Sequence, residues 1–209
     1  MRMWWRELEA QRCAWPIRLS DPREALTLDA LAVVDDSAIL DTSRGPITVG
    51  ARTRICCGAH LVGPIEIGSD CLIGNLAMIR GPASIGDGTR IGFAAELKNV
   101  IIERNVSIGP QCFVADSKLE TGVYLGAQVR TSNHRLDKKN VTVVIDGKVV
   151  DSGLEKLGCL IGANSALGIQ VIVLPGRMIA PDSIFAPRVT VEKNLPTGRY
   201  RHSQQLETF

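Results

Sequence analysis

The chain has 209 residues and a formal net charge of only +2, from 24 Lys and Arg against 22 Asp and Glu. This balance argues against bulk nucleic-acid binding and against an acidic disordered tail. Hydrophobic residues make up 45% of the sequence, which is globular, but aromatic residues only 4%, which is low for an ordinary core. The core is therefore expected to be aliphatic and repetitive.

Composition also predicts where the protein works. No apolar run approaches the roughly 20 residues that span a bilayer, so no membrane span is expected. The first residues lack the apolar segment and the small-residue cleavage site of a secretory signal. Six cysteines without CxxC spacing favour reduced thiols over a disulfide framework. Together these features predict a cytoplasmic protein.

Residues 1–32 are predicted to form an N-terminal helical cap or extension. A short helix is expected from Trp4 to Arg12, and the turn at 20–24 leads into another helical turn. The tryptophans in this segment are expected to cap the open end of the following domain or to pack on a neighbouring subunit. An aromatic ligand platform is the alternative for these three residues: Trp4, Trp5 and Trp15.

Residues 33–194 contain an internal repeat of six residues. Every sixth residue from Val49 to Leu97 is aliphatic, and Gly often follows it. The pattern continues with two five-residue slips to Leu125 and restarts from Ile161 to Val191. A period of six fits neither a helix nor an isolated strand. It predicts coils of short parallel strands with one inward aliphatic residue each, and with corners at residues that tolerate tight turns: Asn75, Asn105 and Asn164.

Residues 131–158 interrupt the repeat with a polar excursion. The strand-like segment 141–145, the turn Asp146-Gly147 and the segment 148–151 predict a β-hairpin. An insertion from a regular solenoid usually lies on one face and carries function or subunit contacts. Residues 195–209 are predicted to form a C-terminal tail.

The six-residue repeat resembles the hexapeptide-repeat family. This resemblance implies an all-β fold, a left-handed parallel β-helix solenoid with three hexads per coil, over 33–194. More specific matches resemble the acetyltransferase domain of sugar-1-phosphate nucleotidylyltransferases. The matching segments are Gly92-Phe93-Ala94-Ala95-Glu96-Leu97-Lys98-Asn99, Val114-Ala115-Asp116-Ser117, Leu125-Gly126-Ala127, Asn133-His134-Arg135-Leu136-Asp137-Lys138-Lys139-Asn140-Val141, Lys148-Val149-Val150-Asp151-Ser152-Gly153, Lys156-Leu157-Gly158 and Ile161-Gly162.

The resemblance implies an acyl-CoA-dependent N-acyltransferase. Acetyl-CoA would be the co-substrate, and the acceptor an amino-sugar phosphate or a nucleotide-linked amino sugar. Direct attack of the amine is expected, at sites between the subunits of a homotrimer. The sequence contains no phosphate-binding Gly-rich loop after a strand, so uridylyl transfer is not expected, and a separate nucleotidyltransferase is a possible partner.

Two positions depart from the family. Where the family has its catalytic His, this chain has Pro110, and where the family has a nearby Tyr, it has Phe113. Imidazole is favoured as a base because its ordinary pKa lies near 6.5. Of the three histidines, His134 is the candidate base, with a surface or substrate-contacting histidine as the alternative. Cys112 is interpreted as a small buried filler rather than a nucleophile.

The resemblance also implies binding residues. Glu96 and Lys98 flank Leu97 and should both face outward; a solvated pair is the alternative. The substrate-binding set is Glu96, Lys98, Asn99, Asn133, Arg135 and Lys139. The basic C-terminal coils and their small residues suit the phosphates and pantetheine arm of CoA, although solubilising charges and ordinary corner residues would look the same. The cofactor-binding set is Lys156, Ala163, Gly168, Arg177 and Arg188.

Other functions remain open. Loss of the family His and Tyr would also suit a non-catalytic sugar-nucleotide-binding or regulatory module. The scaffold could instead serve another acyl or one-carbon donor. No metal site is expected, because the three histidines lack the close spacing of zinc-binding relatives.

Overall fold

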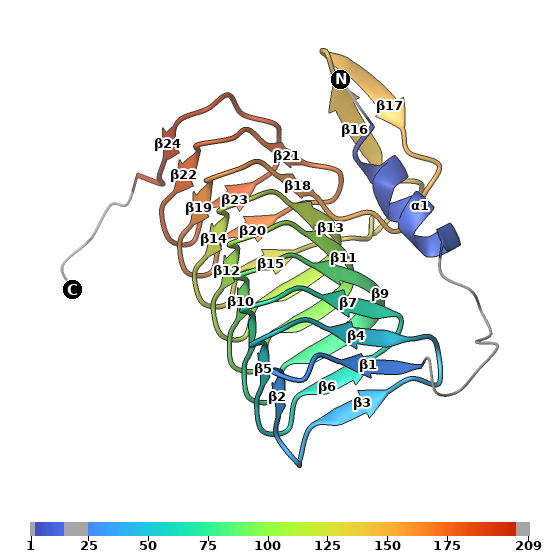
Figure 1. The fold of residues 1–209 in the computed structure, drawn as a ribbon. Helices are drawn as coiled ribbons and strands as arrows, with labels where there is room; N and C mark the ends of the chain where they lie inside the picture. The colour runs from blue at the N-terminus through green and yellow to red at the C-terminus, as the bar shows by residue number, and fades with distance from the viewer. Residues whose placement is uncertain (1–2, 15–24, 204–209) are drawn as a thin grey trace.

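The computed structural model describes residues 3–14 and 25–203. Their strands wind into a parallel β-solenoid built from a 13-stranded and a 9-stranded sheet, with one helix, α1 (Trp5–Ala14), on its flank (Figure 1). This confirms the predicted all-β solenoid of hexapeptide repeats. The predicted turn at 20–24, the helical turn after it and Trp15 lie outside the described residues. No helix in the described ranges is long and apolar enough to cross a membrane.

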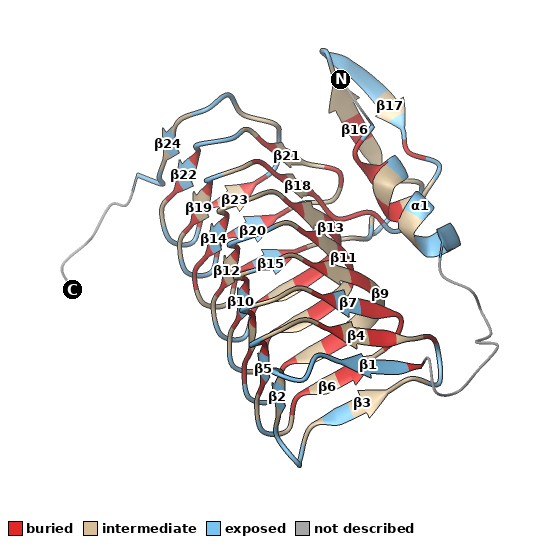
Figure 2. Ribbon diagram, viewed as in Figure 1, coloured by how far each residue is buried: buried red, intermediate tan, exposed pale blue. Residues whose placement is uncertain are grey.

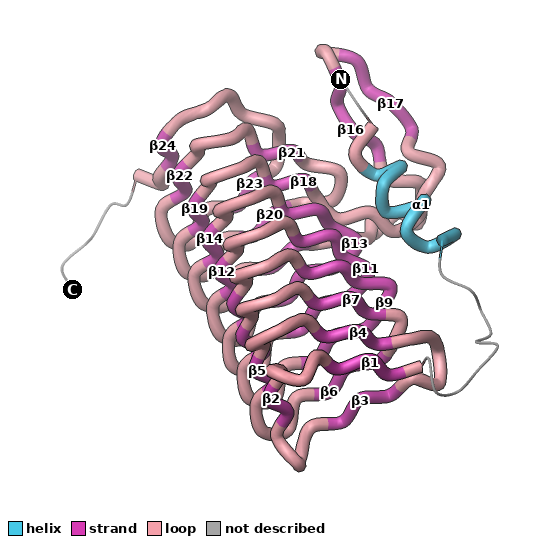
Figure 3. Tube along the Cα trace, in the orientation of Figure 1, coloured by secondary structure: helices cyan, strands magenta, loops and turns pink. Residues whose placement is uncertain are grey.

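The coils form a prism with three faces, and short strands alternate with corner loops along the chain (Figure 3). Three long strands, β9 (Met78–Ile85), β11 (Glu96–Ile102) and β13 (Phe113–Leu119), bend around one corner and join the third face to the first. The first face contains the second halves of these strands with β1 (Leu26–Leu28), β4 (Ile47–Val49), β7 (Ile65–Ile67), β18 (Leu160–Ile161) and β21 (Met178–Ile179).

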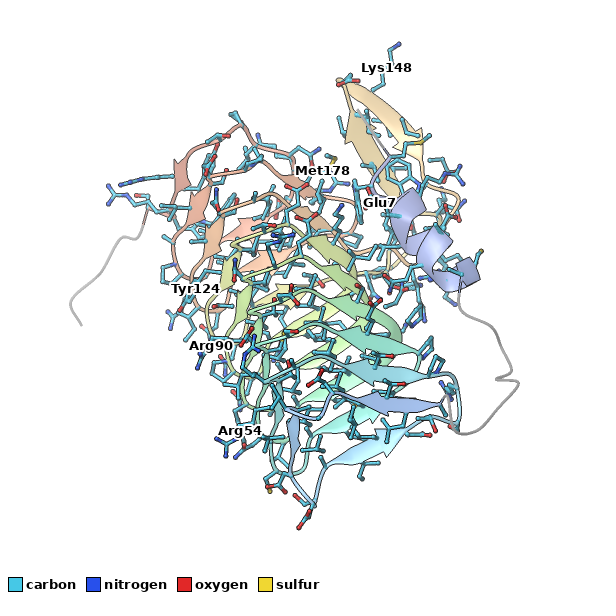
Figure 4. All side chains as sticks on the ribbon, viewed as in Figure 1. Glu7, Arg54, Arg90, Tyr124, Lys148 and Met178 are labelled. Atoms are coloured by element: carbon cyan, nitrogen blue, oxygen red, sulfur yellow. The ribbon has the colours of Figure 1, made fainter. Side chains whose placement is uncertain are left out.

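The second face is the nine-stranded sheet, from which Arg54, Arg90 and Tyr124 project outward (Figure 4). Its strands are β2 (Val33–Val34), β5 (Arg54–Ile55), β8 (Leu72–Ile73), β10 (Arg90–Ile91), β12 (Ser107–Ile108), β14 (Tyr124–Leu125), β19 (Ala166–Leu167), β22 (Ile184–Phe185) and β24 (Arg199–Tyr200). The third face contains the first halves of the long strands with β3 (Ile39–Asp41), β6 (His60–Val62), β15 (Arg130–Thr131), β20 (Ile172–Val173) and β23 (Thr190–Val191).

Register explains which residues become neighbours. Most coils contain 18 residues, as in the contact between Arg52 and Asp70, which are 18 apart in sequence. Asn99 and Asp116 are 17 apart, because the two predicted five-residue slips shorten these coils at the corner where β11 and β13 bend. The parallel ladder starts at Leu26 and ends at Tyr200, so it begins before residue 33 and continues after residue 194.

The corners need residues that tolerate positive φ. Asn105 and Asn164 adopt φ of 57° and 56°, as the sequence predicts. The prediction for Asn75 is wrong by one position, because Leu76 adopts the positive φ of 57° there. Asn is favoured at such angles but is not required, since neighbouring coils hold the backbone in place.

The core is an aliphatic ladder inside the prism (Figure 2). Every sixth residue from Val49 to Leu97 is at most 2% exposed. Parallel stacking about 4.8 Å apart puts each of these side chains on those of adjacent coils. Burial of each large aliphatic side chain stabilises the fold by roughly 1.5–3 kcal/mol. The low aromatic content is thus compatible with a well-packed core.

The excursion contains the predicted hairpin, β16 (Thr142–Ile145) and β17 (Lys148–Asp151), joined by Asp146-Gly147 with φ of 48° and 75°. Helix α1 packs beside it, against β11 and β13 (Figure 1). A second apolar cluster forms there from Trp4, Trp5, Leu8, Val141, Val143 and Leu157. The prediction that Trp4 and Trp5 cap the open end of the coil is therefore wrong, because these tryptophans instead bury the apolar face of the excursion.

Loss of an inward side chain should cost far more than loss of an exposed one. We expect Ile79→Ala to lower the free energy of unfolding by about 2–5 kcal/mol, because Ile79 is fully buried and the shortened side chain leaves a cavity inside the coil. Leu136→Ala, at a side chain that is 98% exposed, should change it by less than about 0.5 kcal/mol. Urea denaturation measures both; equal losses would contradict the ladder.

Thiol reactivity should divide the cysteines into two groups. Burial raises the pKa of Cys159 to about 12 and also raises the pKa of Cys71 and Cys112, so little thiolate forms at mildly alkaline pH. We expect rapid alkylation of the exposed Cys13 and Cys57, and none of the buried three until the chain unfolds. Peptide mapping by mass spectrometry checks this; rapid labelling of native Cys159 would contradict it.

Candidate functional site

The candidate site lies where β11 and β13 bend from the third face to the first, which we call the Asp116 corner. Asn99 and Asp116 each take φ of 49° at this bend. Asn and Asp are the side chains that most readily adopt this left-handed conformation after Gly. Both are almost fully buried, Asn99 at 3% and Asp116 at 1% exposure.

Asp116 is the centre of a polar cluster. Its Oδ1 accepts hydrogen bonds from Arg12 at 2.7 Å and from the Asn99 amide at 2.6 Å. Its Oδ2 accepts one from the Asn133 amide at 2.6 Å, and the Lys98 ammonium lies 4.0 Å away. A buried carboxylate is stable only when paired and hydrogen-bonded, and this one has both kinds of partner. Three predicted substrate-binding residues therefore meet here: Lys98, Asn99 and Asn133.

One acceptor in this cluster is unused. Asn99 donates its amide N–H to Asp116, which fixes the direction of the side chain. Its Oδ1 is buried and has no hydrogen-bond partner among the described residues. A buried oxygen without a donor costs free energy unless a ligand supplies one. Asn99 Oδ1 is therefore an unsatisfied acceptor within the cluster.

The other three predicted substrate residues have different partners. Glu96 does face outward beside Lys98, but it forms an ion pair with Arg80 on the adjacent coil. Arg135 is held by two hydrogen bonds to Asp137, at 2.8 and 2.6 Å. This pair holds the pKa of the Asp137 carboxyl well below its usual range and raises the pKa of Arg135. Lys139 is exposed, and its backbone N–H bonds to Asp137. The Asp116 corner therefore does not include them.

His134 is next to the corner in the chain but does not contact Asp116. Its backbone forms an antiparallel bridge with Lys156, which crosses the base of the excursion. Its side chain is exposed and has no hydrogen-bond partner in residues 3–14 and 25–203. The imidazole ring is therefore accessible from solvent.

The two departures from the family pattern lie away from the Asp116 corner, Phe113 at the start of β13 and Pro110 at another corner. Pro110 is exposed between the second and third faces, where its carbonyl oxygen accepts a hydrogen bond from Gln128. Cys112, two residues further on, is 1% exposed, and its thiol donates to the Gly126 carbonyl at 3.1 Å. Because burial also raises its thiol pKa, this geometry supports the filler interpretation of Cys112.

The predicted cofactor residues are spread over three corners of one chain. Lys156 and Arg177 lie at the base of the excursion, Ala163 lies between the first and second faces, and Gly168 and Arg188 lie between the second and third. Arg177 donates to the carbonyls of Pro175, Glu192 and Thr142, and burial, followed by repulsion from Arg135, lowers its pKa. In a single chain, Arg177 therefore ties the excursion to the last coils.

One hollow contains part of the predicted cofactor set. Arg188, Arg201 and His202 line a space of about 440 Å³, together with Ile169, Ala186 and Pro187 next to Gly168. Two guanidinium groups over small and apolar residues suit a phosphate group attached to an extended arm. Among the described residues, no cluster of His, Cys, Asp and Glu has the arrangement of a metal site.

Sequence reasoning missed two residues of the cluster. Asp116 stands in a quoted family segment and is 17 residues from both Asn99 and Asn133, so the coil length alone could have placed the three together. Arg12 lies outside the repeat, and no spacing rule connects it to Asp116. Its contact depends on how α1 docks, which Glu7 supports through a 2.7 Å ion pair with Lys118.

Removal of the central carboxylate should loosen the whole cluster. We expect Asp116→Ala to lower the free energy of unfolding by more than about 2 kcal/mol, because each stranded buried amide donor costs about 1–3 kcal/mol. Asp137→Ala, which removes a carboxylate from an exposed pair with Arg135, should leave the urea midpoint nearly unchanged. Equal midpoints for the two variants would contradict a buried cluster.

Comparison with known proteins identifies the family. Residues 64–99 match the family described as bacterial transferase hexapeptide (six repeats). YaiX of Escherichia coli O6:K15:H31, described as an uncharacterized acetyltransferase, is 53% identical over 173 residues, which cover 83% of this chain and 75% of that protein. A bifunctional sugar-1-phosphate nucleotidylyltransferase/acetyltransferase of Sulfurisphaera tokodaii is 33% identical over 111 residues, which cover 53% of this chain and 28% of that protein.

A solved structure offers a weaker likeness. AntD, an N-acyltransferase from Bacillus cereus, has a TM-score of 0.42 and 11% identity, over 90% of this chain and 80% of that one. A likeness at this level carries no argument about the site. The family assignment rests instead on the identity and coverage of the YaiX match, together with the repeat on the prism's three faces. This chain belongs to the hexapeptide-repeat transferase family.

Proposed function

We propose that this protein is an acyl-CoA-dependent N-acyltransferase that acetylates an amino-sugar phosphate or a nucleotide-linked amino sugar. One observation carries the proposal: Lys98, Asn99 and Asn133 converge on the buried Asp116. These are three of the residues that the resemblance assigns to sugar binding. The relatives named as acetyltransferases support the same reaction class.

The chemistry sets the demands on the site. The amine nitrogen of the sugar attacks the thioester carbonyl carbon, a C–N bond forms, and the C–S bond breaks as the CoA thiolate leaves. The ammonium must first lose a proton to a base, and the thiolate then takes up a proton. Donors at the carbonyl oxygen stabilise the oxyanion. No covalent acyl-enzyme is needed, in keeping with the buried position of Cys112.

Acceptor binding, proton removal and acetyl-CoA binding each have a candidate among the described residues. Asn99 Oδ1 accepts a hydrogen from a sugar hydroxyl or from the amine, and Lys98 faces the anionic part of the acceptor. His134 serves as the base, because its exposed imidazole adjoins Asn133 in the chain. Arg188 and Arg201 hold the phosphates of acetyl-CoA in the hollow beside Gly168. In a homotrimer, the acceptor and acetyl-CoA sites would meet between subunits.

Some predictions remain without a structural test. Cytoplasmic location, the homotrimer and a separate nucleotidyltransferase partner belong to the proposal. So do the roles of Glu96, Arg135 and Lys139 toward the sugar, and of Lys156, Ala163 and Arg177 toward CoA.

The direct experiment is thiol release from acetyl-CoA across amino-sugar phosphates and nucleotide-linked amino sugars. We expect acceptor-dependent release, and a kcat that falls by about 10²- to 10⁴-fold in His134→Ala, the range for loss of a general base. His60→Ala is the matched control, because His60 lies on β6 of the third face, away from the excursion. Release that survives His134→Ala would reject this base but not the reaction.

One observation favours a second function. Pro110 replaces the family's catalytic His, and proline has no side-chain group that accepts a proton. A non-catalytic module that binds sugar nucleotides would account for this replacement. Sugar-nucleotide binding by calorimetry, with no thiol release from any acceptor, would support the module and reject the acyltransferase.

A further inference from the structure

Helix α1 brings a second cation to the Asp116 corner. Arg12, in the last turn of α1, contacts Oδ1 of Asp116, while Lys98 faces Oδ2 from β11. Asp116 is thus one buried carboxylate between two cations. The acids on these two elements are already paired, Glu96 with Arg80, Glu7 with Lys118 and Glu9 with Arg6. The corner therefore has a local surplus of positive charge, beside the two asparagines that also contact Asp116.

Arg12 has capacity for a second partner. One nitrogen of its guanidinium group bonds Asp116, and the side chain is still 38% exposed. Within the described part of the chain, its remaining N–H groups have no hydrogen-bond partner. The planar guanidinium carries five N–H donors, and it binds phosphoryl oxygens with two parallel hydrogen bonds. Lys98, whose side chain is 31% exposed, can meet the same anion as a point charge.

A hydrogen-bond acceptor lies between these cations and the core. Asn99 Oδ1 is buried and unpartnered, and Asp116 holds it in place through the amide N–H. The corner thus combines one acceptor for a hydroxyl or amine with two donors for an anion. This combination matches a sugar that carries a phosphoryl group close to a hydroxyl or amine.

We propose that Arg12 binds the phosphoryl group of the acceptor, so that α1 forms part of the substrate site and selects phosphorylated or nucleotide-linked amino sugars over unphosphorylated ones. This inference rests on the proposed function and adds to it a specificity-determining residue outside the repeat, Arg12. It gives α1 a role in recognition beyond its packing against the excursion.

A merely structural Arg12 would behave differently. If its only role were to hold α1 against Asp116, its loss would lower the stability of the protein and would lower kcat/KM equally for every acceptor. A recognition role instead changes the preference between two acceptors that differ only in the phosphoryl group. Arg6 supplies a matched control, because it lies on the same helix, carries the same charge and pairs with the exposed Glu9.

The kinetic test compares one amino sugar with and without its phosphate. In Arg12→Gln, we expect kcat/KM for the phosphorylated acceptor to fall about 10- to 100-fold, mainly through KM, the range for a charge-assisted hydrogen bond. In Arg12→Gln, kcat/KM for the unphosphorylated acceptor should stay within about twofold of the wild-type value. Arg6→Gln should resemble the wild type with both acceptors. Equal losses for both acceptors would overturn the proposal. Arg12→Lys keeps the charge and should restore part of the preference if Arg12→Gln folds poorly.

A binding test separates this inference from the reaction itself. Titration of the intact protein with inorganic pyrophosphate, followed by calorimetry, needs no acyl transfer. We expect binding that weakens about 10-fold or more in Arg12→Gln and not in Arg6→Gln. That result without any thiol release would retain the anion site and reject the acyltransferase. Pyrophosphate binding that is absent from the wild type, or equal in both variants, would reject the anion site even if the enzyme is active.

Discussion

Parallel stacking of equal coils is the constraint on which the rest of the structure depends. A strand can pair with the coil below it only if both present the same positions to the core. The aliphatic residues that recur every six positions, with two five-residue steps and one excursion, satisfy this condition along the solenoid. The same stacking makes neighbours of residues 17 or 18 apart in the chain. Residues that form a functional site in such a fold can therefore lie in a column parallel to the solenoid axis.

The Asp116 corner is such a column. Asn99, Asp116 and Asn133 occupy equivalent places in three successive coils, and the two asparagines donate to the acid between them. The shortened coils matter here, because they leave one residue at the bend, held at positive φ. That residue must turn the chain and carry a polar side chain into a buried space. Short Asn and Asp side chains do both.

The sequence was sufficient to predict whatever depends on period. The solenoid, the two short coils, the hairpin with its Asp146-Gly147 turn and the outward direction of Glu96 and Lys98 all follow from local spacing. Sequence reasoning failed where the contacts depend on how helix α1 docks on the solenoid. Nothing in the spacing of Trp4, Trp5 or Arg12 says that α1 lies on the flank, because a helix with two buried tryptophans could cover any apolar surface. Asp116 was missed although its coil position was readable.

The two coil lengths have a consequence for how this chain can change. Coils with paired neighbours on both sides are interchangeable units, so the loss or duplication of a whole coil leaves the remaining ladders in step. Insertion or deletion of a single residue within a strand instead turns the inward side chains of that strand outward. Coils away from Asn99, Asp116 and Asn133, and away from the hollow at Arg188, are therefore free to vary in number, whereas the three coils of the Asp116 corner must stay consecutive. Solenoid length and site chemistry can consequently diverge independently among related chains.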